Sequence, residues 1–304
     1  MNYQLFLNQI TKEIQKCVGS QARVRINQIE KLNYPAADGL TILLPGENTA
    51  PAIYLDPYYQ EYLNGTDLSD IAEQIIAFHE RNKTEGFCDL SFYRDFAEAS
   101  KHIVCRLVNY EKNRTLLEKI PYQRFFDLAI VYYYRIDNSS FGDSGILVQN
   151  NHVHLWNTDN ASLHAIAAQN TRSLLPFQIT TLPQMLADMP EVSLPMPIEP
   201  TPSMYILTNE KMSYGAVNII YHDILDAVAE RLGCDYYILP SSIHECLLLP
   251  VSSWNDTEPQ RLQKIVSEIN EQYVADEEVL GDQVYRYVRA SGCLVQATEK
   301  PSQS

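Results

Sequence analysis

Two clusters of residues carry side chains that could do chemistry. The first is His152-x-His154, with Asp159 and His164 nearby in the sequence. Imidazole and carboxylate groups are common zinc ligands, and two histidines at i and i+2 meet on one face of a strand. They diverge on a helix, and the sequence guarantees no fourth ligand. We therefore interpret these histidines as solvent-facing or hydrogen-bonded side chains and predict no metal site.

The second cluster is the run Ser241-Ser242-Ile243-His244-Glu245-Cys246, which gathers a hydroxyl, an imidazole, a carboxylate and a thiol. Nucleophilic catalysis requires a nucleophile within reach of a base. Because neighbours on an extended chain point to opposite faces, His244 and Cys246 could share a face while Glu245 leaves it. The alternative, which we favour, is a turn at Pro240-Ser241-Ser242 between two strands, with His244 as an edge residue.

Arg106, His164 and His244 are the candidates for a catalytic site. Arg106 lies in a largely apolar segment that we predict to be a strand, and a buried arginine needs a carboxylate or backbone partner. His164 lies on a predicted helix, where it could instead brace the loop that contains Trp156. A structural role is the alternative for each residue, and catalysis would require the three to line one cleft.

The sequence lacks the common catalytic and cofactor signatures. It contains no G-x-x-x-x-G-K-S/T, no G-x-G-x-x-G after a predicted strand, no G-x-S-x-G and no H-E-x-x-H. With 11 glycines among 304 residues, the chain has little material for loops that cradle phosphates. We therefore expect neither P-loop nucleotide hydrolysis, nor Rossmann dehydrogenation, nor α/β-hydrolase chemistry, and no cofactor.

Charge and composition indicate the class of partner. The formal net charge of −15 argues against nucleic-acid binding, which needs lysines and arginines that face phosphates. The acidic residues are scattered, so we attribute them to solubility rather than to mimicry of nucleic acid. None of the six cysteines forms a C-x-x-C pair, and we expect reduced thiols. No apolar run reaches the roughly 20 residues of a membrane span, and the first residues do not resemble a signal peptide, so we expect a cytoplasmic protein without membrane contacts.

Apolar periodicity predicts an α+β fold with helices packed on mixed sheets. Residues 126–136 are apolar on both alternating faces, which is typical of a central strand covered on both sides. The expected helices are 2–18, a segment after Asp56-Pro57, one from Asp67, 90–99, 111–117, 158–169, 223–232 and 256–272. The expected strands are 23–26, 40–44, 52–55, 102–108, 126–136, 145–148, 204–208, 216–220, 235–239, 246–249 and a hairpin near 284–295.

Five prolines between Met189 and Pro202 mark the expected domain boundary. Proline fixes φ and removes an amide donor, as in an extended linker. We therefore divide the chain into an N-terminal α+β region (1–120), a middle strand-helix region packed with it (121–189), a linker (190–203), a smaller C-terminal α+β domain (204–297) and a disordered tail (298–304).

Several segments follow the pattern of a known family. They are Ala52–Leu55 with Tyr58–Tyr62, His102–Asn109, Asp127–Tyr133, Leu163-His164 with Asn170-Thr171 and Leu174–Pro176, Met204–Asn209, and Tyr236–Ser242 with His244-Glu245. In these segments the chain resembles an uncharacterised domain-of-unknown-function family of anaerobic gut bacteria of the Clostridia type. It is more distantly similar to the uncharacterised YtpQ-like bacterial family. Both resemblances imply a shared fold and a cytoplasmic setting, and neither implies catalytic residues. Asn157-Thr158 departs from the pattern, because a glycine usually follows the residue equivalent to Trp156.

Two classes of function follow from these observations. The first is a non-enzymatic protein-interaction or regulatory module with a tyrosine-rich surface, because the chain has 20 tyrosines and tyrosine is enriched at interfaces. If most tyrosines were instead buried in the core, their number would not indicate an interface. The second is an enzyme of unrecognised type with a site around His164, Arg106 and His244. We favour the first.

Overall fold

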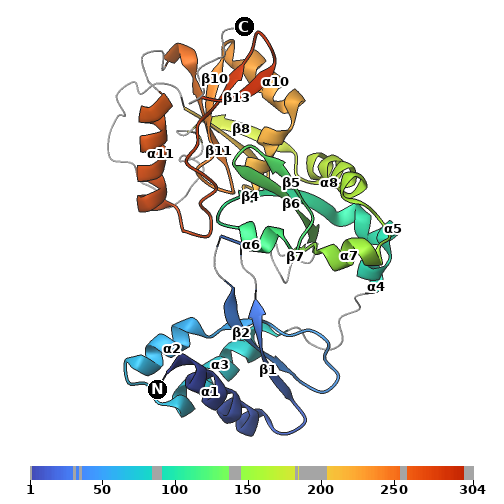
Figure 1. The fold of residues 1–304 in the computed structure, drawn as a ribbon, viewed down its shortest axis with the longest axis vertical. Coiled ribbons are helices and arrows are strands. Elements are labelled where there is room, and N and C mark those ends of the chain that lie inside the picture. Colours follow the sequence, from blue (N-terminus) through green and yellow to red (C-terminus); the bar gives the residue numbers. More distant parts are fainter. Residues whose placement is uncertain are drawn as a thin grey trace. The chain divides into compact units, whose positions relative to one another are not determined.

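The structure is a computed structural model that describes residues 2–29, 32–33, 36–83, 91–136, 145–181, 184, 204–253 and 259–297. It divides into two compact units, Met1–Phe92 (unit 1) and Tyr93–Ser304 (unit 2), which we describe separately (Figure 1). Both units combine helices and sheets, which confirms the predicted α+β class. Every strand pairing among the described residues is antiparallel. None of the described helices combines the length and the apolar character that a membrane crossing requires.

Unit 1 is a three-stranded sheet with helices packed on one face (Figure 1). The sheet has the order β1-β2-β3. Its elements are α1 (Tyr3–Val18), β1 (Arg23–Ile29), β2 (Ala37–Leu43), β3 (Ile53–Tyr54), α2 (Asp56–Leu63) and α3 (Leu68–Asn82). The core joins α1 and α3 to the inner face of the sheet through buried apolar side chains, among them Phe6, Ile10, Leu40, Ile42, Ile71 and Ile75.

The first helix begins and ends where the sequence predicts. The Asn2 side chain accepts a hydrogen bond from the Leu5 amide at 2.9 Å, which satisfies one of the free amides of the first turn. Gly19 ends the helix with φ of 84°, a conformation that costs glycine little. The apolar stripe between these caps turns toward the sheet and positions β1.

His79 is a buried polar residue in the core of unit 1. Its side chain on α3 is 1% exposed, and neither ring nitrogen has a hydrogen-bond partner among the described residues. Burial lowers the pKa of this imidazole, because the charged form loses its hydration. His79 is also the only histidine among the residues of unit 1.

We expect unit 1 to lose stability as the pH falls below about 6.5, the ordinary pKa of histidine. In this range the unfolded chain binds a proton that the folded His79 does not, so protons favour unfolding; the loss ends at the lowered folded pKa. His79→Leu should remove this pH dependence and raise the free energy of unfolding near neutral pH by about 1–2 kcal/mol, because no unbonded nitrogen remains buried. Denaturant unfolding followed by circular dichroism at several pH values measures both effects. An unchanged slope in the variant would contradict the assignment to His79.

Unit 2 contains a four-stranded sheet whose centre is β6 (Leu128–Arg135). β6 pairs with β4 (Ile103–Asn109), β5 (Tyr122–Phe125) and β7 (Gly145–Leu147), and all but its last residue are buried, as its two apolar faces predict. α8 (Asn160–Leu174) packs against β4. The short helices around this sheet are α4 (Ser91–Arg94), α5 (Phe96–Ala99), η1 (Ser100–His102), α6 (Arg114–Leu117) and α7 (Asn150–Leu155).

A six-stranded sheet completes unit 2, in the order β13-β12-β10-β11-β9-β8. Its strands are β8 (Phe177–Thr181), β9 (Tyr205–Asn209), β10 (Tyr236–Leu239), β11 (Cys246–Pro250), β12 (Tyr285–Val288) and β13 (Cys293–Gln296). The remaining elements are η2 (Gly215–Ile220), α10 (His222–Leu232), η3 (Val251–Ser253) and α11 (Pro259–Tyr273).

The proline-rich segment 190–203, expected to be a linker, and the tail 298–304 lie outside the described residues. The strands on either side of this segment pair directly, with Phe177 opposite Asn209. In addition, the Asn109 side chain donates to the Leu280 carbonyl at 3.0 Å. Parts of the chain that we expected in separate domains therefore share one sheet and one compact unit, and the structure divides after Phe92 instead.

Residues 216–220 form the 3-10 helix η2 rather than the expected strand. Short apolar runs do not distinguish a buried strand from a buried helical turn by periodicity alone. Here the buried Asn218 side chain donates to Thr208 and Gly215 carbonyls, both at 2.9 Å, and this bonding favours a compact turn. β5 and β8 were not predicted; each directly follows a proline, Pro121 or Pro176, and each contains polar residues.

Candidate functional site

Arg106 lies on β4 with its guanidinium between two tyrosine rings. Its Cζ atom is 4.1 Å from the ring centroid of Tyr133 and 3.4 Å from that of Tyr214. The residue is 8% exposed. Burial raises the pKa of Tyr133 to about 12, so this ring stays a neutral phenol beside the cation. The arginine therefore joins the β4–β6 pair to the loop before η2 through cation–π contacts.

His244 contacts the same tyrosine. The Tyr214 amide donates to Nδ1 of His244 at 3.2 Å, and the two ring centroids are 5.2 Å apart. Because Nδ1 accepts this bond, the imidazole proton of the neutral ring lies on Nε2, which is 3.3 Å from Oε1 of Glu278. Tyr214 itself has a left-handed backbone, with φ of 54°. Two of the three candidate residues, Arg106 and His244, therefore converge on Tyr214.

The space beside this cluster is small. Arg106, Tyr214, Ser213 and Arg135 line a cavity of about 20 Å³, which is close to the room that one water molecule needs. The described residues therefore leave no room for a substrate between Arg106 and Tyr214. The arrangement fixes the loop before η2 against the four-stranded sheet.

His164 does not join this cluster. Its Nδ1 atom is 3.2 Å from the Tyr132 hydroxyl, and Tyr132 is the cross-strand partner of Cys105. Because side chains alternate along β4, Cys105 and Arg106 point to opposite faces of the sheet. His164 thus lies on the face that α8 covers, where burial lowers the pKa of its imidazole.

His152 and His154 lie on a helix, so their side chains diverge. Nδ1 of His152 is 2.9 Å from the Tyr93 hydroxyl, and the ring packs against Tyr93 and Trp156. Among the described residues, no three histidine, cysteine or acidic side chains are grouped as metal ligands.

The run Ser241–Cys246 connects β10 to its neighbour β11, as the predicted turn requires. The His244 amide donates to Oγ of Ser242 at 3.0 Å. Cys246 is fully buried, and burial raises the pKa of its thiol well above the ordinary value. Burial also raises the pKa of Glu245. A buried neutral thiol is a poor nucleophile, and the run acts as a structural turn.

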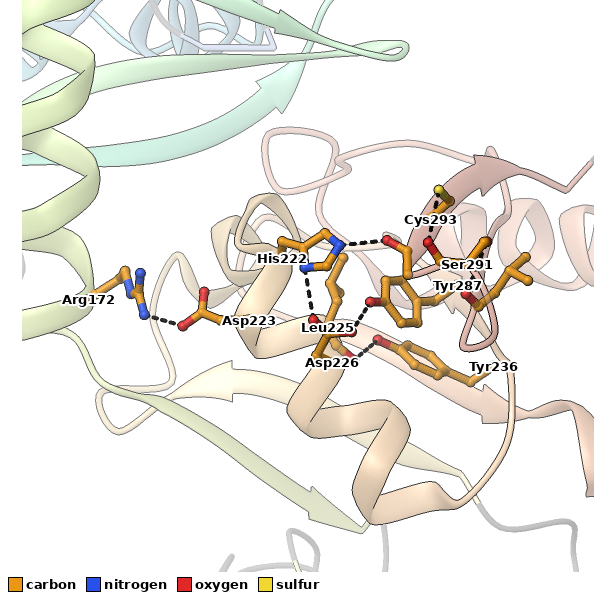
Figure 2. Close-up of polar contacts among 11 residues, drawn as sticks. Arg172, His222, Asp223, Leu225, Asp226, Tyr236, Tyr287, Ser291 and Cys293 are labelled. Atoms are coloured by element: carbon orange, nitrogen blue, oxygen red, sulfur yellow. Dashed lines mark hydrogen bonds and ion pairs between the residues drawn. The ribbon is translucent and has the colours of Figure 1, made fainter.

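Figure 2 shows a second polar network, which joins α10 to the β12–β13 hairpin. The Tyr287 hydroxyl donates to Asp226, and Nδ1 of His222 is 2.9 Å from the same carboxylate. Nε2 of His222 is 2.6 Å from the Gly292 carbonyl. Both ring nitrogens are therefore engaged, and neither is left to act as a base toward the nearby Cys293 thiol.

A second hollow lies beside the residues that precede β10, where Asp235, Ser252 and Arg289 contribute to its lining. It has a volume of about 650 Å³, within the range of ligand sites. The charged residues of its lining, however, are already bonded: Asp235 accepts a hydrogen bond from Arg286 at 2.7 Å, and Arg289 donates to the Gly233 carbonyl at 3.1 Å.

A groove on unit 1 differs from this hollow because its charged groups have no partner among the residues that the structure describes. Arg23 and Arg25 are exposed on the outer face of β1, where they line a groove of about 270 Å³ together with Asn27 and Thr41. No ion pair or hydrogen bond joins either guanidinium to a residue that the structure describes. We call these residues the arginine groove. The sequence contained its signal, two arginines at i and i+2 of an alternating strand, but that pattern is equally typical of a solvated face.

The comparisons with known proteins identify a family of unknown function, and they show neither a gut-bacterial origin nor a similarity to the YtpQ-like family. No curated protein and no solved structure matches the chain significantly. A family model described as a family of unknown function, DUF5688, matches residues 3–289, nearly the whole chain. The chain therefore belongs to the DUF5688 family.

Proposed function

We propose that this protein is a non-enzymatic protein-interaction module that contacts an acidic partner through the arginine groove. The observation that carries this proposal is the pair of exposed, unpaired guanidiniums of Arg23 and Arg25 in one groove. The described helices of unit 1 cover the inner face of this sheet, whereas Arg23 and Arg25 lie on its outer face. Guanidinium groups bind carboxylates in a bidentate geometry, and arginine is enriched at protein interfaces.

The burial of the described tyrosines argues against a tyrosine-rich interface. Most of the described tyrosines are buried or half-buried, and Tyr132, Tyr236, Tyr285 and Tyr287 are among the largest fully buried side chains. Within the described part of the chain, Tyr54 is the only tyrosine among the exposed large hydrophobic side chains, at 36% exposure. The support for an interaction module therefore comes from the two arginines and not from a tyrosine-rich surface.

The alternative is an enzyme with its site at Arg106 and His244. Their convergence on Tyr214 supports this alternative, because a catalytic pair must share a site. The separate position of His164 and the cavity of about 20 Å³ weaken it, because a substrate must reach the reacting groups. A binding partner can reach the exposed arginine groove, and we therefore favour an interaction module over an enzyme.

Charge reversal tests the proposal. The probe is a short fluorescein-labelled peptide of alternating glutamate and threonine, and fluorescence polarisation measures its affinity for the full chain. Arg23→Glu/Arg25→Glu should weaken binding by about tenfold or more, because two attractive pairs become repulsive ones.

The control is Lys12→Glu/Arg81→Glu, which changes the net charge by the same amount on the helical side of unit 1. This variant should lose much less affinity. Equal losses in the two variants would show that only net charge matters, and they would contradict a site in the groove.

A further inference from the structure

β1 is an outer strand of the unit 1 sheet, and the register shows which of its backbone groups face away from β2. The Leu55 amide donates to the Asp38 carbonyl at 3.0 Å, so the backbone polar groups of Asp38 point toward β3. Asp38 is the cross-strand partner of Gln28. In an antiparallel pair, a residue whose polar groups point away belongs to a non-hydrogen-bonded pair. The N–H and C=O groups of Gln28 therefore point to the free edge.

The same alternation assigns the rest of β1. Val24 and Ile26 share the orientation of Gln28, whereas Arg25 and Asn27 face β2. The Thr41 hydroxyl donates to the Arg25 carbonyl at 3.4 Å, which agrees with that assignment. No backbone hydrogen bond between Val24, Ile26 or Gln28 and another described residue occupies this edge.

We propose that the partner's acidic segment binds as an extended strand along the free edge of β1. This inference rests on the proposed function and adds the partner's conformation and sequence pattern. The backbone of the segment bonds to Val24, Ile26 and Gln28, as in strand addition to an exposed sheet edge. Its side chains at every second position lie on the face of Arg23 and Arg25.

The spacing of Arg23 and Arg25 along β1 defines the acidic pattern. Residues two apart on a strand are about 6.6 Å apart, and side chains directly across a strand pair are about 5 Å apart. Asp or Glu at alternate positions of the segment therefore meets Arg23 and Arg25 in turn. A second copy of β1 fits this edge less well, because an antiparallel copy brings its own arginines close to these two.

Proline at position 28 separates strand addition from simple charge attraction. Gln28 is exposed and its N–H points outward, so Gln28→Pro removes one edge donor in a place where an edge strand tolerates proline. Gln28→Ala keeps the N–H and removes the same side chain, including its hydrogen bond to Asp38. We expect Gln28→Pro to weaken binding of the alternating peptide by about five- to tenfold, and Gln28→Ala to leave it nearly unchanged.

Amide hydrogen exchange supplies a second measurement. The bound alternating peptide should slow exchange at Val24, Ile26 and Gln28, while Arg25 and Asn27, already bonded to β2, change little. If charge reversal of Arg23 and Arg25 weakens binding but Gln28→Pro does not, strand addition is overturned and the proposed function stands. If neither change weakens binding, both strand addition and the proposed function are overturned. If oligothymidylate bound as tightly as the alternating peptide and Gln28→Pro did not weaken its binding, the acidic peptide partner would be overturned in favour of a nucleic acid.

Discussion

Arg106→Lys is expected to lower the free energy of unfolding of unit 2 by about 2 kcal/mol, although the charge is kept. The guanidinium lies 4.1 Å and 3.4 Å from two ring centroids, and a flat, weakly hydrated group is needed to stack on both rings. Lysine retains a point charge but loses the stacking and most of the donors. Urea unfolding followed by tryptophan fluorescence measures the loss, because the buried Trp156 lies in unit 2.

The control is Arg124→Lys on β5. Arg124 also lies over a ring, with Cζ 3.7 Å from the centroid of Tyr110, but it is exposed. An exposed cation–π contact contributes only about 0.5–1 kcal/mol, so this variant should lose less than half as much stability. Equal losses would mean that burial between Tyr133 and Tyr214 adds nothing to the contribution of Arg106.

Gly215→Ala is expected to destabilise unit 2 by about 2–3 kcal/mol, because the added methyl group overlaps the backbone of β9. A Cβ atom at this position would be 2.5 Å from Oγ1 of Thr208 and 2.7 Å from the Asn209 amide nitrogen. The Gly215 amide also donates to the His244 carbonyl at 2.9 Å, so the backbone has little freedom to move away.

Gly281→Ala is the matched control for this substitution. A Cβ atom there would have its nearest neighbour, Oδ2 of Asp127, at 3.4 Å, which is ordinary contact. The change should be within about 0.5 kcal/mol of zero or slightly stabilising, because alanine restricts the unfolded chain. A loss at Gly281 as large as that at Gly215 would attribute both effects to backbone flexibility and not to overlap.

The parts of the fold that depend on local sequence could be predicted. α1 follows from the Asn2 cap, its apolar stripe and Gly19, and β6 follows from its two apolar faces. The pairing of β8 with β9 could not, because it joins residues on either side of a proline-rich segment and no local pattern encodes a partner. The strand predicted at 216–220 was wrong for a different reason. The backbone of η2 is fixed by buried hydrogen bonds of the Asn218 side chain, which apolar periodicity does not encode.

The candidate sites show the same division. Alternation along residues 23–26 places Arg23 and Arg25 on one face, so their shared direction is encoded locally. The groove itself is completed by β2 and the loop that follows it, and neither guanidinium finds a partner among the described residues. The spacing of the two arginines in the sequence predicts neither feature. Arg106 and His244 both contact Tyr214 only because the two sheets of unit 2 pack together. No sequence motif surrounds Tyr214, so this convergence could not be predicted.

The most direct test of the arginine groove is an exchange of charge between the two partners. It measures the ratio of affinities for the alternating glutamate peptide and an alternating lysine peptide, at one salt concentration. In Arg23→Glu/Arg25→Glu this ratio should shift toward the lysine peptide by at least about tenfold more than in Lys12→Glu/Arg81→Glu, which carries the same net charge. Identical shifts in the two variants would contradict recognition by Arg23 and Arg25.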